Sequence, residues 1–120
     1  VSQRIIEQNI ALARQYGAVN TVIAAQDTIL QSSDGQFMHH TPDRQTLFQM
    51  QTPQTFRFDW IWQAHQARLN GHIEQPVTDD CTLVHAVGHP VALCPGEKRN
   101  IKVTTPEDLL FAQALLHTGA

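Results

Sequence analysis

The beginning of the chain changes from a helical to a strand-like pattern of apolar positions. Residues 3–16 repeat apolar side chains at helical spacing, with Ser2 able to cap the first turn and Gly17 able to end the last. The side chains expected to face the core are Ile6, Ile10 and Ala13. Residues 18–24 are rich in β-branched side chains and predict a strand. A helix, a glycine and a strand in this order predict half of a parallel-sheet unit.

Residues 25–44 predict a projecting β-hairpin arm. Residues 27–32 and 36–41 are the expected strands, and Ser33, Asp34 and Gly35 supply turn residues between them. The apolar side chains of this segment are Ile29, Leu30, Phe37 and Met38. They are too few to bury both faces of a ribbon. The arm is therefore expected to leave the body and to pair with another chain.

The remaining residues alternate between short apolar runs and helical patterns. The expected elements are a strand at 47–50, an extended loop at 51–56, a helix capped by Asp59 and reaching Asn70, a helix capped by Thr78 and ended by Gly88, strands at 91–94 and 101–103, and a helix at 106–117. The last helix is expected to bury Leu109, Leu110, Ala112 and Leu116. Together these elements predict an α/β layered unit over residues 1–120.

Composition excludes several classes of partner. The chain has 120 residues and a net charge of −3, and its arginines are scattered, so no basic surface for nucleic acid is expected. No apolar stretch approaches the roughly 20 residues needed to span a bilayer. Cys81 and Cys94 are expected to be free thiols of a cytoplasmic protein. Because Val1 opens directly into a helical pattern, we expect the C-terminal portion of a longer protein.

Several kinds of chemistry find no support in the spacing of residues. The 7 histidines form no HExxH or CxxC-type pattern, and His39 and His40 point to opposite faces of the expected strand. Neither Cys81 nor Cys94 has a base at a spacing typical of a nucleophile. The chain also lacks both common glycine-rich phosphate loops, GxxxxGK[ST] and GxGxxG. A metal centre, a cysteine enzyme and a self-contained nucleotide enzyme are therefore not predicted.

Two cations are placed where they could meet an anion. Lys102 is one of two lysines and falls on the expected strand at 101–103, just before a helix that Thr105 caps. An ordinary surface lysine is the alternative. Arg44 follows the arm, where it could clamp a phosphate bidentately or form an ion pair with Asp43. The hydroxyls of Thr28, Thr52 and Thr78 could donate to an oxygen-rich ligand, although Thr78 could equally cap its helix.

Four segments, in order, resemble the cytidylyltransferases that make CDP-activated polyols. They are residues 17–22 running into 27–29, then 43–44, then 51–56 (QTPQTF), then 78–80 with 100–109. That family includes the methylerythritol phosphate and ribitol phosphate cytidylyltransferases. The resemblance covers nearly the whole chain and corresponds to the C-terminal half of the family.

The resemblance implies a Rossmann-like, nucleotidyltransferase-type sheet, a homodimer built through the β-arm, and a Mg²⁺-assisted reaction. In that reaction the acceptor phosphate attacks the α-phosphate of CTP and pyrophosphate leaves. The family's acceptor-positioning residues correspond to Arg44 and Lys102 here. Thr28 and Thr78 fall where the family has further acceptor contacts. Since the arm is exchanged between subunits, the resemblance allows Arg44 or Thr28 to serve the partner's active site.

The family's CTP loop and its acidic Mg²⁺ segment lie upstream of the residues present here, so this chain alone is predicted to be inactive. Residues 17–29 and 49–54 resemble the ribitol branch, whereas residues 78–84 and 96–100 resemble the methylerythritol branch. The sequence favours ribitol 5-phosphate slightly, with 2-C-methyl-D-erythritol 4-phosphate as the alternative acceptor. Two other hypotheses remain: a non-catalytic dimerisation or binding module, and a nucleotidyltransferase acting on a sugar 1-phosphate.

Overall fold

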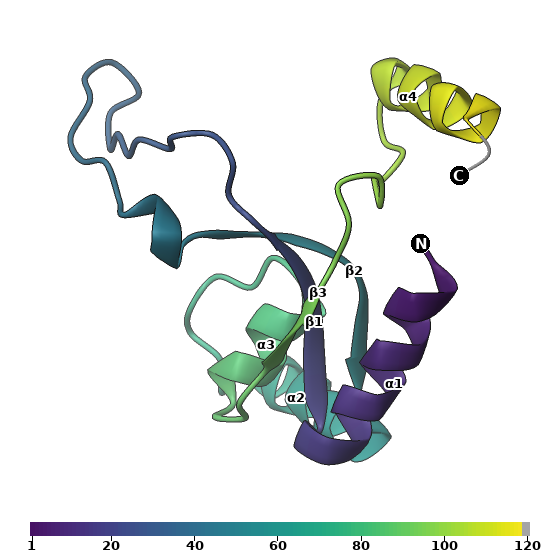
Figure 1. The fold of residues 1–120 in the computed structure, drawn as a ribbon. Coiled ribbons are helices and arrows are strands. Elements are labelled where there is room, and N and C mark those ends of the chain that lie inside the picture. Colours follow the sequence, from purple (N-terminus) through teal and green to yellow (C-terminus); the bar gives the residue numbers. More distant parts are fainter. Residues whose placement is uncertain (119–120) are drawn as a thin grey trace.

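A computed structural model describes residues 1–118 and shows a small mixed sheet with helices on both faces (Figure 1). The strands are β1 (Ala18–Ala24), β2 (Phe48–Phe56) and β3 (Ala92–Pro95). The helices are α1 (Gln3–Tyr16), the short 3-10 helix η1 (Arg44–Thr46), α2 (Phe58–Leu69), α3 (Asp80–Ala86) and α4 (Pro106–His117). Within these residues the sheet order is β2-β1-β3, with β1 antiparallel to β2 and parallel to β3. No helix among them is both long and apolar enough to cross a bilayer.

The side chains of β1 divide between two cores because successive residues of a strand point to opposite faces. On one face Ala18 packs against α2 and α3, through Ala64, Leu83 and Val84. On the other face Val19 packs against Ala13 of α1 and Cys94 of β3. The predicted α/β layering is confirmed, with helices packed against both faces of β1.

The helix α1 has the predicted bounds but not the predicted buried face. Its caps are as expected, since Ser2 Oγ accepts from the Ile5 amide at 3.3 Å and Gly17 takes φ 94°. The buried side chains are Ile5, Asn9 and Ala13, whereas Ile6 and Ile10 are each 44% exposed. The prediction is right for Ala13 and wrong for Ile6 and Ile10, because it did not allow a polar residue on the buried face. Asn9 is buried with its hydrogen bonds made: it donates to Thr21 Oγ1 at 2.9 Å and accepts from Thr55 Oγ1 at 2.9 Å.

The expected loop at 51–56 is wrong, because β2 continues through it to Phe56. The pairing register between β1 and β2 shifts within this stretch: Asn20 pairs with Gln54, and Val22 pairs with Met50. Pro53 lies inside the irregular part, where a proline costs no ladder hydrogen bond. A proline that predicts a loop from sequence is thus accommodated by a bulge in a strand.

The segment predicted as an arm, residues 25–44, extends away from the sheet, but the two predicted strands are wrong for most of its length (Figure 1). A single bridge joins Gln31 and His40, and Asp34 closes the turn by accepting from the Gln36 and Phe37 amides at 2.8 and 3.0 Å. Its apolar side chains are exposed, so no packing against the body holds the two sides in register. A ribbon without a packed face is only marginally stable.

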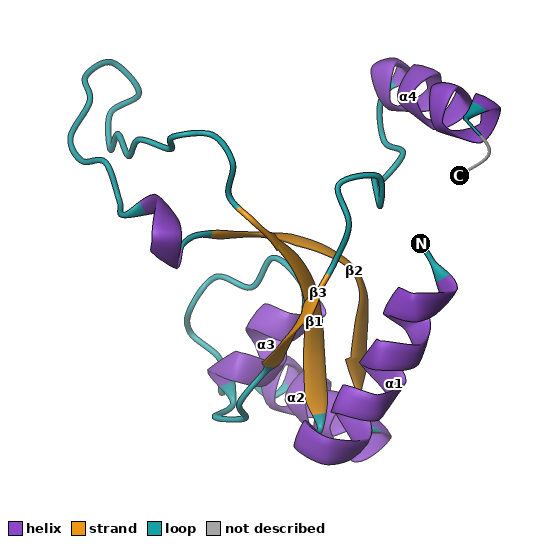
Figure 2. Cartoon of the chain, in the orientation of Figure 1, coloured by secondary structure: helices purple, strands orange, loops and turns teal. Residues whose placement is uncertain are grey.

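The C-terminal helix α4 has the predicted bounds and cap but no buried residue. Leu109, Leu110 and Leu116 are 53%, 66% and 72% exposed, so their predicted burial is wrong, as is that of the partly buried Ala112. The strand expected at 101–103 is also wrong: these residues are exposed and belong to the loop between β3 and α4 (Figure 2). Sequence periodicity identified the helix, but it carried no information on what the helix packs against.

Candidate active site

A cleft of about 820 Å³ lies beside the carboxyl ends of β1 and β3. Its walls come from β2, from the chain around the start of α3, from the segment at 98–102 and from Asp108. The carboxyl edge of parallel strands is where α/β sheets usually bind ligands. The structure brings Lys102 and Thr78 together in this cleft. Arg44 and Thr28 are not among its lining residues and lie on the exposed arm.

Asp79, rather than Thr78, caps α3, so that part of the sequence prediction is wrong. Asp79 Oδ1 accepts from the Thr82 amide at 2.8 Å, and its Oδ2 accepts from Gln54 Nε2 at 3.1 Å. The other end of the Gln54 amide accepts from the Cys81 amide at 3.2 Å. Burial would raise the pKa of the Asp79 carboxyl, but hydrogen bonds from Thr82 and Gln54 outweigh it and lower the pKa below its usual value. This leaves the Thr78 hydroxyl without a hydrogen bond among the described residues, on the wall of the cleft.

Lys102 lies on an exposed span that is anchored at both ends. Before it, Asn100 Nδ2 donates to the carbonyl of Thr52 on β2 at 2.7 Å. After it, the Asp108 carboxylate accepts from the Thr104 amide at 3.1 Å and from the Thr105 amide at 3.0 Å. Hydrogen bonds from the Thr104 amide and hydroxyl, and from Thr105, lower the pKa of Asp108. The lysine is therefore placed by its neighbours' contacts and not by a strand.

The cleft carries both signs of charge, but its carboxylates are already engaged. Asp79 and Asp108 accept main-chain N–H groups, and Asp80 lies 3.1 Å from His65 Nε2. Neither Lys98 nor Lys102 forms an ion pair within residues 1–118. Two cations that face an open cleft without a carboxylate partner suit an anionic ligand.

Arg44 does not pair with Asp43, which was the alternative expected from sequence. Its Nη1 donates to the carbonyl of Gln26 at 2.9 Å, across the base of the arm. The Asp43 carboxylate instead caps η1 by accepting from the Gln45 amide at 3.0 Å. Arg44 is exposed, and four of its guanidinium N–H groups have no partner in the part of the chain that is described.

Neither of the two thiols lines this cleft. Cys81 and Cys94 are free and buried, as expected for thiols in a small core. Burial, with the nearby charges of Asp79 and Asp80, raises the pKa of Cys81 to about 12. Burial also raises the pKa of Cys94. A thiol that stays protonated at neutral pH is a poor nucleophile. Residues 1–118 also contain no cluster of three or more His, Cys, Asp or Glu side chains placed to hold a metal ion.

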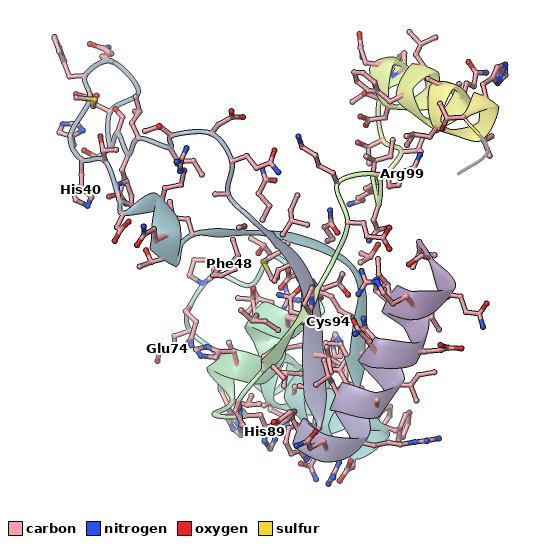
Figure 3. The ribbon with its side chains drawn as sticks, in the orientation of Figure 1. His40, Phe48, Glu74, His89, Cys94 and Arg99 are labelled. Atoms are coloured by element: carbon pink, nitrogen blue, oxygen red, sulfur yellow. The ribbon has the colours of Figure 1, made fainter. Side chains whose placement is uncertain are left out.

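Sequence reasoning missed the contribution of the two glutamines of the QTPQ stretch. Gln54 holds the start of α3, and Gln51 contacts the turn that follows β3, on which Figure 3 labels Arg99. Glutamine amides leave no spacing signal, because the pattern of a strand shows only which face a side chain occupies. The resemblance pointed to this stretch without indicating what the amides bind.

Both the sequence and the fold match known proteins. The family model described as 2-C-methyl-D-erythritol 4-phosphate cytidylyltransferase (IspD) matches residues 1–118. The chain belongs to this family. Two relatives named 2-C-methyl-D-erythritol 4-phosphate cytidylyltransferase are similar to it: one from Syntrophotalea carbinolica, 46% identical over 114 residues, and one from Alkaliphilus oremlandii, 39% identical over 118 residues. The alignments cover 95% and 98% of this chain but 48% and 49% of the relatives, so the chain spans about half their length.

Solved structures of IspD proteins share the fold. The 2-C-methyl-D-erythritol 4-phosphate cytidylyltransferase of Thermus thermophilus is 34% identical with a TM-score of 0.82, covering 98% of this chain and 56% of that one. The 4-diphosphocytidyl-2C-methyl-D-erythritol synthase of Anaerococcus prevotii is 33% identical with a TM-score of 0.84, covering 97% and 53%. The expected α/β nucleotidyltransferase fold and cytidylyltransferase family are confirmed. The slight preference for the ribitol branch finds no support, because the family model and these relatives carry the methylerythritol description.

Proposed function

We propose that this chain supplies the acceptor side of an enzyme that transfers CMP from CTP to 2-C-methyl-D-erythritol 4-phosphate, with release of pyrophosphate. The observation that supports this proposal is the cleft at the carboxyl ends of β1 and β3, which is lined by Lys98, Lys102 and Thr78. The names of the relatives support the choice of acceptor.

Charge is the main obstacle to this reaction, because two phosphate-bearing molecules must approach each other. The Lys102 ammonium would bind the phosphate of the acceptor and hold one of its oxygens toward the α-phosphate of CTP. That oxygen forms the new bond to phosphorus, and the bond to pyrophosphate breaks. Thr78 would donate its hydroxyl hydrogen to an acceptor oxygen. Positioning and charge stabilisation then account for catalysis by these residues without a base.

The arm is proposed to build a homodimer in which Arg44 and Thr28 reach the partner's cleft. Phe37 and Met38 near its tip are 71% and 68% exposed, which suits contact with a second subunit. Arg44 keeps free guanidinium donors at the base of this arm. The arrangement would explain why these two residues do not line the cleft of their own chain.

The CTP-binding and Mg²⁺-binding residues are proposed to lie outside this chain, in a missing N-terminal half. The alignments leave about half of each relative uncovered, which leaves room for such a part. Residues 1–118 present no cluster of side chains that would hold a metal ion, and the roles proposed for Lys102 and Thr78 do not involve one. This chain by itself is accordingly proposed to be inactive.

The test is pyrophosphate release by the intact protein that carries this chain, supplied with CTP, Mg²⁺ and one polyol phosphate at a time. Release with 2-C-methyl-D-erythritol 4-phosphate supports the proposal. Release only with ribitol 5-phosphate would show that the proposed acceptor is wrong but that the proposed reaction, CMP transfer to a polyol phosphate, is right. Release with neither, or formation of a nucleotide sugar from a sugar 1-phosphate, would overturn the function.

A further inference from the structure

The turn that follows β3 carries Lys98 and leads directly to Lys102, so whatever fixes this turn also places both cations of the cleft. The turn runs through residues 96–100. Its first residue is tied to the sheet, since the Gly96 amide donates to the carbonyl of Val22 at 2.7 Å. Beyond Gly96 the turn leaves the sheet and needs other partners for its main chain.

Gln51 of β2 supplies those partners. Its Nε2 donates to the carbonyl of Glu97 at 2.9 Å, and its Oε1 accepts from the amide of the same residue at 3.3 Å. One side-chain amide thus satisfies both main-chain groups of Glu97, as a paired residue on a neighbouring strand would. The same Oε1 accepts from Asn100 Nδ2 at 3.2 Å. We call these three contacts the Gln51 clasp.

The clasp fits closely against the turn. A Cβ at Gly96 would clash with Oε1 of Gln51 and would lie 3.1 Å from the Thr21 methyl group. Only a glycine lets the turn approach the glutamine amide this closely. The clasp therefore depends on Gly96 as well as on Gln51 and Asn100. Gln51 and Asn100 are both partly buried and line the cleft.

A second set of contacts holds the turn from the start of α1: the bond from Ser2 is partly buried and the ion pair with Arg4 is exposed. Ser2 Oγ donates to the Glu97 carboxylate, and Arg4 pairs with that carboxylate at 3.3 Å, with side chains 44% and 31% exposed. Exposed ion pairs contribute little to stability in water. The contacts from Gln51 of β2 are therefore expected to contribute more to fixing the turn than the ion pair with Arg4.

We propose that Gln51 is a positioning residue, whose amide fixes the 96–100 turn to β2 and thereby sets where Lys98 and Lys102 stand in the cleft. For catalysis the inference rests on the proposed function, because Gln51 would act through the lysine that binds the acceptor phosphate. The clasp itself does not depend on that function and is tested separately.

The first test measures amide hydrogen exchange by NMR in the intact protein that carries this chain. In Gln51→Met, which keeps the length of the side chain but removes the amide, the Glu97 amide should exchange about tenfold faster. The Gly96 amide should keep its protection, because its partner is the carbonyl of Val22. If Gln51→Met does not fold, Gln51→Glu replaces the donor to the Glu97 carbonyl with a carboxylate that repels it. The turn should then open more often, and the Asn100 amide, which bonds to that carbonyl at 3.0 Å, should exchange faster.

Two control variants make this test selective. Gln63→Met is the same chemical change on the exposed face of α2, where the glutamine side chain makes no hydrogen bond in the described part of the chain, and it should alter neither amide. Arg4→Gln removes the outer ion pair and should have a smaller effect than Gln51→Met. Unchanged Glu97 protection in Gln51→Met, or an equal loss in Arg4→Gln, would overturn the proposal.

The second test is kinetic. In Gln51→Met the KM for the polyol phosphate should rise about tenfold while the KM for CTP stays constant, because only the acceptor phosphate meets the displaced lysine. In the double variant Gln51→Met/Lys102→Ala, kcat/KM for the polyol phosphate should be less than about twofold below that of Lys102→Ala alone, since both changes act on the same contact. Equal losses for both substrates, or full additivity with Lys102→Ala, would overturn positioning through Lys102. If the unaltered protein releases no pyrophosphate, the proposed function is wrong. The hydrogen-exchange result then decides by itself whether Gln51 fixes the 96–100 turn.

Discussion

Apolar side chains are buried in the sheet body but exposed in the two segments that leave it, the arm and α4. In the body, Leu83, Val84 and Val19 are fully buried, and each contacts a core shared by several elements. In the arm and in α4, Phe37 and Leu116 are 71% and 72% exposed. A helix or turn can thus be fully specified by its local sequence while its apolar face has no partner in the described chain. The body holds the cleft in place, and the arm and α4 expose apolar surface outside it.

The largest difference in stability between body and arm is expected on substitution of two glycines, each of which has a positive φ. Gly17 has φ 94° and Gly35 has φ 73°. A Cβ at Gly17 would also run into the Trp60 ring, whereas a Cβ at Gly35 would meet nothing within 4 Å. Gly17→Ala should lower the free energy of unfolding by about 4 kcal/mol, combining backbone strain with overpacking. Gly35→Ala should cost about 1 kcal/mol or less in urea denaturation. Equal costs would show that the arm is as constrained as the body.

Leucine truncation compares the two regions without any backbone effect. Leu83→Ala empties a fully buried position in α3 and should cost about 3 kcal/mol. Leu110→Ala removes the same atoms from a side chain that is 66% exposed and should cost less than about 0.5 kcal/mol. Both are measured by urea denaturation of the intact protein. A large cost for Leu110→Ala would mean that α4 is buried against residues outside this chain.

Lys102 belongs to neither region, and its substitution separates function from stability. Lys102→Ala should lower kcat/KM for the polyol phosphate about 100-fold in the intact protein, as expected for the loss of a charged hydrogen-bonding partner. The unfolding midpoint should not change, because the side chain is exposed. Lys98→Ala is the matched control within the same cleft and should have a smaller effect. Turnover equal to that of the unaltered protein would remove Lys102 from the acceptor site.

How far the sequence predicted this structure also differs between the two regions. In the body, capping residues and periodicity placed α1, β1 and β3 to within a residue or two, because those signals act over one or two turns of chain. The buried Asn9 was missed because polar periodicity does not show that a side chain's hydrogen bonds will be made inside. Lys102 was identified as a candidate for the wrong structural reason: its expected strand is a loop, held by Gln51, Asn100 and Asp108. Such contacts join positions up to 49 residues apart and leave no local pattern.

The smallest expected effect compares two carboxyls whose pKa values are both lowered. Main-chain hydrogen bonds from Phe37 and Gln36 lower the pKa of Asp34 in the arm, and hydrogen bonds from Thr82 and Gln54 outweigh burial at Asp79 in the body. A carboxyl with a lowered pKa in the folded state stabilises that state above its unfolded value of 3.8 and loses this contribution as the pH falls through the folded pKa.

Asparagine at each position keeps a capping oxygen but does not titrate. As the pH falls below the unfolded value of 3.8, the unaltered protein should lose more unfolding free energy than Asp79→Asn, because only the former has a carboxylate to protonate at this position. Asp34→Asn should follow the unaltered protein throughout, since the arm can open without unfolding the sheet. Urea denaturation at a series of pH values makes the measurement. If Asp34→Asn also flattened the pH dependence, the arm would have to fold cooperatively with the body, and the division between the two regions would not hold.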